Sequence, residues 1–177
     1  MRTATDLLAS YAEYHRDRRN IATHFVGIPM IVFAVCVLLA RPAFEVAGVT
    51  LSPAWIVLAL SALWWCTRGK LVLGALLSLI TAGMVVLAQQ IAAGPTAAWL
   101  AWGVGGFVLG WVIQFVGHYY EGRKPAFVDD LVGLLVGPMF VLAEAMFALG
   151  WEGELQREIE RRAGPTHLRE LHSRPAR

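Results

Sequence analysis

Four long apolar runs dominate the first two-thirds of the chain. They cover residues 24–40, 51–66, 71–91 and 97–116, and none of them contains Asp, Glu, Lys or Arg. A helix that spans the hydrocarbon core of a bilayer needs roughly 17–25 predominantly apolar residues. The pattern therefore predicts four membrane-spanning helices. Glycines 103, 106 and 110 of the fourth run indicate close helix packing, because small residues let helices approach each other in lipid.

A fifth apolar segment, residues 131–150, differs from the other four. It holds Gly137-Pro138 near its middle and Glu144 further on. Proline inside a helix removes a hydrogen bond and kinks or breaks the helix, and a charge at the centre of a membrane costs about 2.5–3.5 kcal/mol. We expect a broken or re-entrant segment rather than a full span.

Composition agrees with a membrane protein. Of the 177 residues, 57% are hydrophobic and 16% are charged, with a mean hydropathy of +0.56, whereas soluble domains average about 25% charged residues. The predicted fold class is all-α, a polytopic membrane helical bundle formed by residues 1–150. Residues 151–177 form a charged tail with one short surface helix, in which we expect poor order beyond Gly164-Pro165 and solvated histidines at 167 and 172. We expect no nucleic-acid partner, while self-association into a homo-oligomer stays open.

The basic residues predict an orientation. Lysine and arginine favour the cytoplasmic side of a membrane. With the N-terminus inside and four spans, every one of the 15 basic residues except Arg41 lies inside. A full fifth span would move the arginines of the tail outside, so the charges favour a fifth segment that returns to its starting side. We therefore expect the N-terminus and the tail on the cytoplasmic side of a bacterial inner membrane.

Two polar clusters flank the predicted spans on that same side. In the first, Asn20 and His24 are four residues apart and share a helix face, whereas His15 and His24 are nine apart and point about 180° apart on a straight helix. For both histidines to meet, either the chain bends between them or His15 comes from a separate element. In the second cluster, Gln114, His118 and Glu121 form one polar stripe.

These residue types predict metal chemistry. Imidazole and carboxylate ligands suit iron and zinc, and two histidines with one carboxylate are typical of non-haem Fe(II) oxygenases. The alternative is that each histidine only reaches the lipid headgroups. The pair Arg123-Lys124 also has two interpretations, contact with headgroups or an anchor for a substrate carboxylate.

Three motifs carry a resemblance to a known family. They are Y-H-x4-N-x3-H-x2-G-I-P at 14–29, Q-F-x-G-H-x2-E-x3-P-A at 114–126 and G-P-x-F-V-x-A-E at 137–144. In this order and spacing the chain resembles the small membrane proteins typified by the fungal 2-hydroxy-fatty-acid dioxygenase. The resemblance covers roughly residues 5–150.

The resemblance implies an Fe(II)-dependent α-oxidation in which a long-chain 2-hydroxy fatty acid reacts with O2 and loses its carboxyl carbon. It implies that His15, His24 and His118 bind the iron. Glu121 and Glu144 occupy acidic positions of the same motifs, and we add Asn20 and Gln114 as candidate catalytic residues and Arg123 and Lys124 as candidate substrate-binding residues. The lipid bilayer would supply the acyl substrate.

Two other classes of function stay open. The same residues could hold zinc and a bound water, as in a hydrolase of lipid amides or esters; such an enzyme turns over without oxygen. A transporter or a non-enzymatic membrane protein is the other class, although a transporter usually shows internal repeats and polar sites at mid-membrane, and the sequence has neither.

Overall fold

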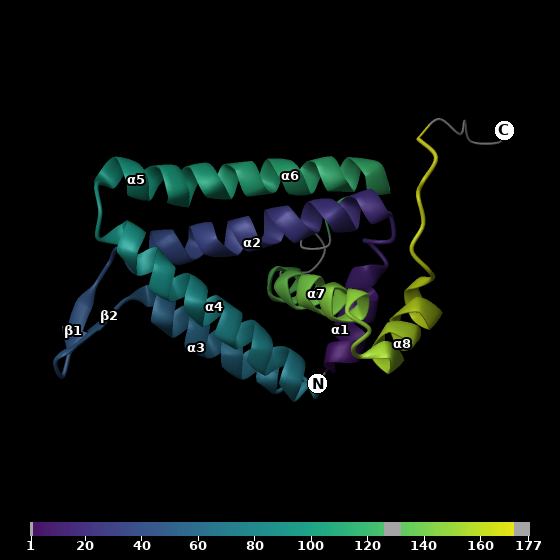
Figure 1. Ribbon diagram of the computed structural model, residues 1–177, viewed down its shortest axis with the longest axis horizontal. Helices are drawn as coiled ribbons and strands as arrows, with labels where there is room; N and C mark the ends of the chain where they lie inside the picture. Colours follow the sequence, from purple (N-terminus) through teal and green to yellow (C-terminus); the bar gives the residue numbers. More distant parts are fainter. Residues whose placement is uncertain (1, 126–131, 172–177) are drawn as a thin grey trace.

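The computed structural model describes residues 2–125 and 132–171, and these residues are mainly helical. Figure 1 shows the arrangement. In chain order the elements are α1 (Ala4–Ala12), α2 (Arg18–Ala40), β1 (Phe44–Val46), β2 (Val49–Leu51), α3 (Pro53–Cys66), α4 (Leu71–Ala92), α5 (Thr96–Leu100), the π-helical turn η1 (Ala101–Gly105), α6 (Gly106–Glu121), α7 (Gly133–Ala148) and α8 (Gly153–Ala163). The prediction of an all-α membrane bundle is confirmed.

Three of the predicted spans have the length and hydropathy to cross a membrane: α2, α4 and the continuous helix Thr96–Glu121 formed by α5, η1 and α6. The remaining predicted span, 51–66, forms α3, which has 14 residues. It is about 21 Å long at 1.5 Å per residue, which is shorter than the roughly 30 Å hydrocarbon core. It packs along α4 through the backbone of Trp65, where Gly74 leaves no space for a side chain. The bundle therefore contains three full-length candidate spans and one shorter apolar helix.

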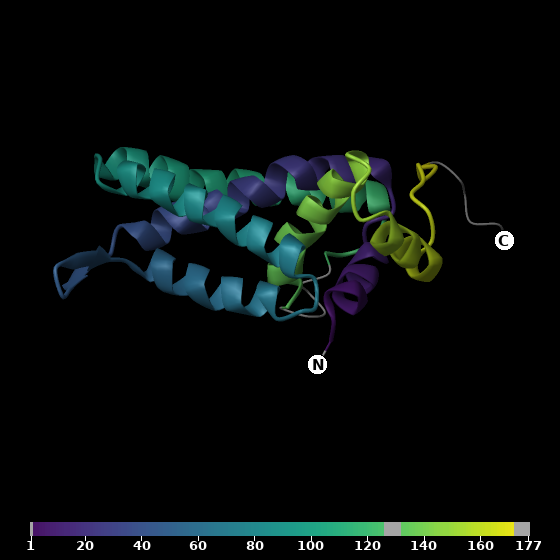
Figure 2. The same ribbon diagram turned by 60° about the horizontal axis from the view of Figure 1, so that its bottom comes forward.

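The long helices α2 and α6 lie side by side in both ribbon views (Figures 1 and 2). Glycines allow this approach: a Cβ on Gly27 would meet Gln114, one on Gly117 would meet Thr23, and one on Gly110 would lie 2.6 Å from Ile31. The predicted close packing is confirmed at Gly110, and also at Gly103, which contacts Leu38. This contact brings the two polar clusters of the sequence together.

The fifth apolar segment forms one continuous helix, α7, with Pro138 inside it. The expected broken or re-entrant segment is confirmed, although the helix does not break at Gly137-Pro138. The chain bends instead by 118° between α7 and α8, where Gly150 and Glu152 have positive φ angles of 78° and 53°. Residue 131, the expected start of the segment, lies outside the described residues. The bend returns the chain to the end of the bundle where α1 lies (Figure 1).

The N-terminal helix and the tail helix pack against each other at that end. Leu7 and Leu8 of α1 share a hydrophobic core with Leu155 and Ile159 of α8 and with Phe140 of α7. Thr3 caps α1 through a capping box with Asp6, a signal that the sequence carries but that our prediction did not use. The tail helix is thus part of the folded unit.

The chain beyond α8 is held rather than free. It runs alongside the turn before α2, where Arg18 N donates to the carbonyl of His167 at 2.9 Å and His167 N donates to the carbonyl of Arg16 at 2.9 Å. The expectation of poor order after Gly164-Pro165 is wrong for residues up to 171. His172, Arg174 and Arg177 lie outside the described residues.

The opposite end of the bundle carries a feature that we did not predict, a β-hairpin formed by β1 and β2. Its turn residues Ala47 and Gly48 both have positive φ angles, 50° and 78°, as a tight two-residue hairpin requires. Figure 2 shows the hairpin far from α1 and α8. Arg41 ends α2 three residues before β1, so this one basic residue lies at the end away from the polar clusters.

Candidate metal centre

Three histidines from three elements converge at the end of the bundle where α1, α7 and α8 lie. His15 comes from the turn between α1 and α2, His24 from α2 and His118 from α6. Their ring centroids lie 4.4 Å (His15–His24), 5.0 Å (His15–His118) and 5.2 Å (His24–His118) apart. Of the two geometries left open by the spacing of His15 and His24, the separate element is the one found, because α2 begins only at Arg18.

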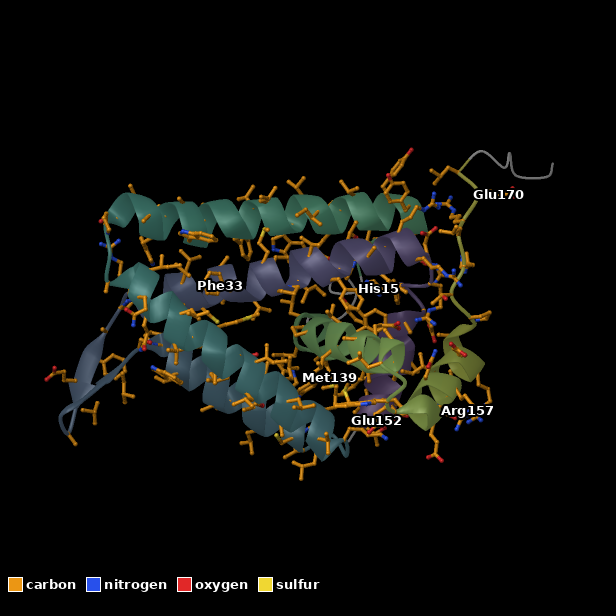
Figure 3. The ribbon with its side chains drawn as sticks, in the orientation of Figure 1. His15, Phe33, Met139, Glu152, Arg157 and Glu170 are labelled. Carbon is orange, nitrogen blue, oxygen red and sulfur yellow. The ribbon has the colours of Figure 1, made fainter. Side chains whose placement is uncertain are left out.

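The histidines are enclosed by protein rather than turned to the headgroups. His15 and His24 are 0% and 1% exposed, and His118 is 6% exposed. Figure 3 places His15 between α2 and α7. The ring of Tyr11 in α1 stacks on the ring of His15 at 4.1 Å with an interplanar angle of 5°, and Phe140 of α7 lies at 5.5 Å. These two aromatic rings fix the plane of His15.

Hydrogen bonds determine which ring nitrogens face the shared space. His15 Nδ1 lies 2.6 Å from the carbonyl oxygen of Tyr11, and His24 Nδ1 lies 2.8 Å from that of Asn20. A carbonyl only accepts, so each Nδ1 donates its proton and each Nε2 keeps a lone pair. The ring of His118 hydrogen-bonds the backbone of Arg123, and its Nδ1 has no hydrogen-bond partner among the described residues.

This arrangement fits a metal ion. One nitrogen from each ring lies within 4.8 Å of the other two, and ligands about 2.0–2.1 Å from one ion lie about 3–4 Å apart, so small ring movements complete the geometry. His15 Nε2 and His118 Nδ1 are buried without a partner, which is costly unless a ligand satisfies them. Burial holds the pKa of His15 well below its usual value, so its ring is neutral, as a metal ligand must be.

Glu121 holds the backbone that carries His15. Its carboxylate accepts from the amides of Arg16 at 3.0 Å and Asp17 at 2.9 Å, and from the side-chain amide of Asn20 at 3.0 Å. Each of these donors lies in or next to the turn between α1 and α2. The structure thus assigns this carboxylate a positioning contact, and it does not belong to the cluster of candidate ligand atoms.

Glu144 holds the same turn through a different group. Its carboxylate lies 3.6 Å from the guanidinium of Arg16, which is buried and also donates to the carbonyls of Ala12 and His15 at 2.9 and 3.0 Å. A second Arg16 nitrogen donates to the carbonyl of Gly164 at 3.0 Å. The two carboxylates that the sequence singled out therefore act on the His15 turn from two helices.

A small cavity of about 60 Å³ opens beside His24 and His118. Gln114, one turn before His118, lines it together with Tyr11, and its Nε2 is buried without a hydrogen-bond partner among the described residues. The Asn20 amide oxygen is also buried without a partner. Gln114 thus lines a cavity shared with two candidate metal ligands, and its unsatisfied amide nitrogen lies against Gly27 of α2.

The basic pair lies outside this cavity. Arg123 donates to the carbonyl of Glu13 at 2.9 Å and lies 5.9 Å from the ring centroid of Tyr14. Lys124 is exposed next to it. Neither side chain lines the cavity beside the histidines. Both lie at the end of α6 that carries the candidate metal centre.

Three contributors to the site were missed in the sequence: Tyr11, Arg16 and Asp17. Asp17 caps α2 and accepts from the Arg19 side chain at 2.7 and 3.0 Å and from Arg169 N at 2.8 Å. The capping box of α1 and the Asp17 cap at the start of an apolar run were signals for two helices separated by a turn. Tyr11, four residues before His15, would then lie in the last turn of the first helix, close to the histidine.

The sequence of the chain is similar to that of known proteins. A model of the family described as "2-hydroxy-palmitic acid dioxygenase Mpo1-like" matches residues 1–149. The chain belongs to this family. It is 29% identical over 159 residues to the 2-hydroxy-palmitic acid dioxygenase MPO1 of Saccharomyces cerevisiae, an alignment that covers 86% of this chain and 85% of the yeast protein. No solved structure matches the chain.

The family match includes all three histidines and both glutamates, and it ends just after α7. The elements that follow, α8 and the tail, nevertheless contact the turn that carries His15. The resemblance stated from the three motifs is confirmed.

Proposed function

We propose that this chain is an Fe(II)-dependent dioxygenase that converts a long-chain 2-hydroxy fatty acid into the fatty acid one carbon shorter. The observation that carries the proposal is the enclosed cluster of three imidazoles, two of which have a buried nitrogen without a partner among the described residues, in a chain of this family. The balanced reaction is R–CH(OH)–COOH + O2 → R–COOH + CO2 + H2O. The carboxyl carbon leaves as CO2 and the hydroxyl-bearing carbon becomes the new carboxyl.

Three side chains would hold the iron: His15 and His24 through Nε2 and His118 through Nδ1. Bound there, Fe(II) would offer open positions to O2 and to the hydroxyl and carboxylate oxygens of the substrate. Tyr11 and Phe140 hold the ring plane of His15, and Glu121 and Glu144 hold its backbone. Fixed ligand orientation of this kind is a common task of the residues around metal ligands.

The remaining candidate residues take part in substrate binding. Gln114 lines the cavity beside two of the ligands and carries an unsatisfied side-chain amide, which would donate to an oxygen of the substrate head group. Asn20 orients His24 through its carbonyl and would also be close to the reacting group. Arg123 and Lys124, exposed at the same end of α6, would attract the anionic head group to this surface.

The proposal includes the orientation of the protein. The candidate metal centre, α1, α8 and the basic residues of α2 and α8 lie at one end of the bundle (Figures 1 and 3), with Arg41 at the other. The distribution of positive charge favours the first end as the cytoplasmic one. A bacterial inner membrane would place it there.

A zinc-dependent lipid hydrolase is the second candidate, and one observation favours it. The cluster offers three nitrogen ligands and no carboxylate, and three histidines with an open fourth position also form catalytic zinc sites. Dependence on oxygen separates the two reactions, because hydrolysis proceeds without it.

The test combines metal binding with oxygen dependence. The detergent-purified protein should bind one Fe(II), and it should consume 2-hydroxypalmitate only when O2 is present. His15→Ala, His24→Ala and His118→Ala should each abolish iron binding, whereas His167→Ala, an exposed histidine outside the cluster, should leave it unchanged. Stoichiometric iron in all three cluster variants, or equal turnover without O2, would overturn the proposal.

A further inference from the structure

A second, larger cavity lies between five helices next to the candidate metal centre. It measures about 390 Å³, and it opens at the surface of the bundle, because Val57, Phe107 and Leu134 of its lining are 44%, 36% and 49% exposed. Its walls come from α2, α3, α4, α6 and α7 and are apolar apart from Ser61 and Thr81. The Thr81 hydroxyl donates to the carbonyl of Leu77 at 2.8 Å, so it is already satisfied. We call this cavity the apolar chamber.

The apolar chamber adjoins the small cavity that His24 and His118 line. Five of the lining residues belong to both cavities: Ile31, Val32, Trp111, Leu134 and Pro138. The two cavities are therefore neighbours that share part of one wall. A molecule with a polar head and a long apolar tail could place its head beside the histidines and its tail in the chamber.

One face of α6 leads from the polar end to the apolar end. On α6 the residues at spacings of four, three and four are His118, Gln114, Trp111 and Phe107, of which Trp111 and Phe107 line the chamber. Residues three and four apart lie on one face of a helix. This face of α6 therefore carries a candidate metal ligand and an amide at one end, and two aromatic side chains that line the chamber further along.

The small cavity and the apolar chamber together have the length of a long acyl chain. On α2 the chamber reaches Leu39, which is 15 residues after His24 of the small cavity, or about 22 Å along the helix at 1.5 Å per residue. An all-staggered chain of 16 carbons is about 19 Å long, at about 1.3 Å per carbon. The yeast relative is named for an acid of this length.

We propose that the apolar chamber holds the acyl chain of the substrate, with the methyl end near Leu39 and Phe107. This inference rests on the proposed function, because it names where that reaction's substrate lies. Leu39 and Val35 then set the upper limit of chain length. Each methylene that finds space in the chamber strengthens binding by about fourfold, which corresponds to about 0.8 kcal/mol.

The first test shortens the chamber at two depths. Val35→Trp blocks it 11 residues from His24, about 16 Å, and Leu39→Trp blocks it at the far end. We expect Val35→Trp to lower kcat/KM for a 16-carbon substrate at least tenfold while a 10-carbon substrate keeps its rate. Leu39→Trp should affect only chains of about 16 carbons or more. Val108→Trp, at a residue of α6 that is 55% exposed, should leave the length profile unchanged.

The second test does not depend on turnover. A 2-hydroxy fatty acid with a photoreactive diazirine at its methyl end should label the end of the chamber near Leu39, Ala54 and Phe107. The same group at mid-chain should label residues near Trp111. Mass spectrometry of the cross-linked peptides locates both.

The outcomes separate the inference from the proposed function. Failure of the wild-type protein to oxidise any 2-hydroxy fatty acid would overturn the function, while labelling would still test the chamber. Turnover with an unchanged length profile in Val35→Trp would overturn the chamber. So would labelling at Met84 and Leu142, which line a separate hollow of about 200 Å³, or only at lipid-facing residues such as Val108.

Discussion

The carboxylate of Glu121 offers the sharpest test of how the site is built. It accepts from two backbone amides, those of Arg16 and Asp17, and from the side chain of Asn20. The change Glu121→Gln keeps the shape but replaces one oxygen with an NH2 group, which is a donor. One buried backbone amide of the turn before α2 then faces a donor instead of an acceptor.

The magnitude follows from the bonds that change. A hydrogen bond to a charged group contributes about 1.5–3 kcal/mol, and a buried donor without a partner costs about 1–3 kcal/mol. We expect the free energy of unfolding of the metal-free protein to fall by about 2–4 kcal/mol. Because the turn carries His15, metal affinity should fall about 10- to 100-fold, the usual effect of losing a residue that orients a ligand.

The assays are denaturant unfolding in detergent, iron titration, and hydrogen exchange at the amides of Arg16 and Asp17. The variant should exchange faster at these two amides than the wild type. Glu13→Gln, a change at an exposed residue of the same turn, is the matched control and should alter none of the three. Loss of iron binding with unchanged unfolding and unchanged exchange would refute the reasoning, because it would mean that Glu121 binds the metal itself.

Three further changes test other parts of the fold. Gly117→Ala should destabilise the protein by about 1–3 kcal/mol, because its methyl group would meet Thr23 across the α2–α6 contact; thermal unfolding measures this, and an unchanged midpoint would contradict the close approach. Asp6→Asn should lower stability at neutral pH, since hydrogen bonds with Thr3 hold the Asp6 pKa at about 2, below its ordinary value of 3.8. The folded pKa is depressed, so the contribution is present above pH 4, and the difference between variant and wild type should vanish as the pH falls from about 4 to about 2; a difference that stays constant with pH would oppose this. Deletion of 164–177 should weaken iron binding, because the tail hydrogen-bonds the turn that carries His15; equal iron affinity would show that the tail is dispensable.

Much of this architecture could be read from hydropathy. Runs of apolar residues identify membrane helices because lipid imposes a length and excludes charge, and the segment 71–91 coincides closely with α4. The position of the bend after α7 could not be read in this way. Proline at 138 costs one hydrogen bond but the neighbouring packing keeps the helix, whereas the positive φ angles at Gly150 and Glu152 depend on how α8 docks on α1.

The candidate metal centre was predictable in its members but not in its roles. Histidines near a membrane surface stand out because ionisable groups are rare there, and the spacing of His15 and His24 already required two elements. The sequence could not show that Glu121 and Glu144 hold the turn of His15, because both contacts join residues more than 100 positions apart. Nor could it show the contribution of the tail, whose charged composition resembles that of a solvated end.

The central claim is best tested by oxygen uptake combined with product mass. Detergent-purified protein loaded with Fe(II) and given 2-hydroxypalmitate should consume one O2 for each substrate and release a fatty acid one carbon shorter together with CO2. Folded, iron-loaded protein that consumes no oxygen, or that yields a product of unchanged chain length, would contradict the proposed α-oxidation.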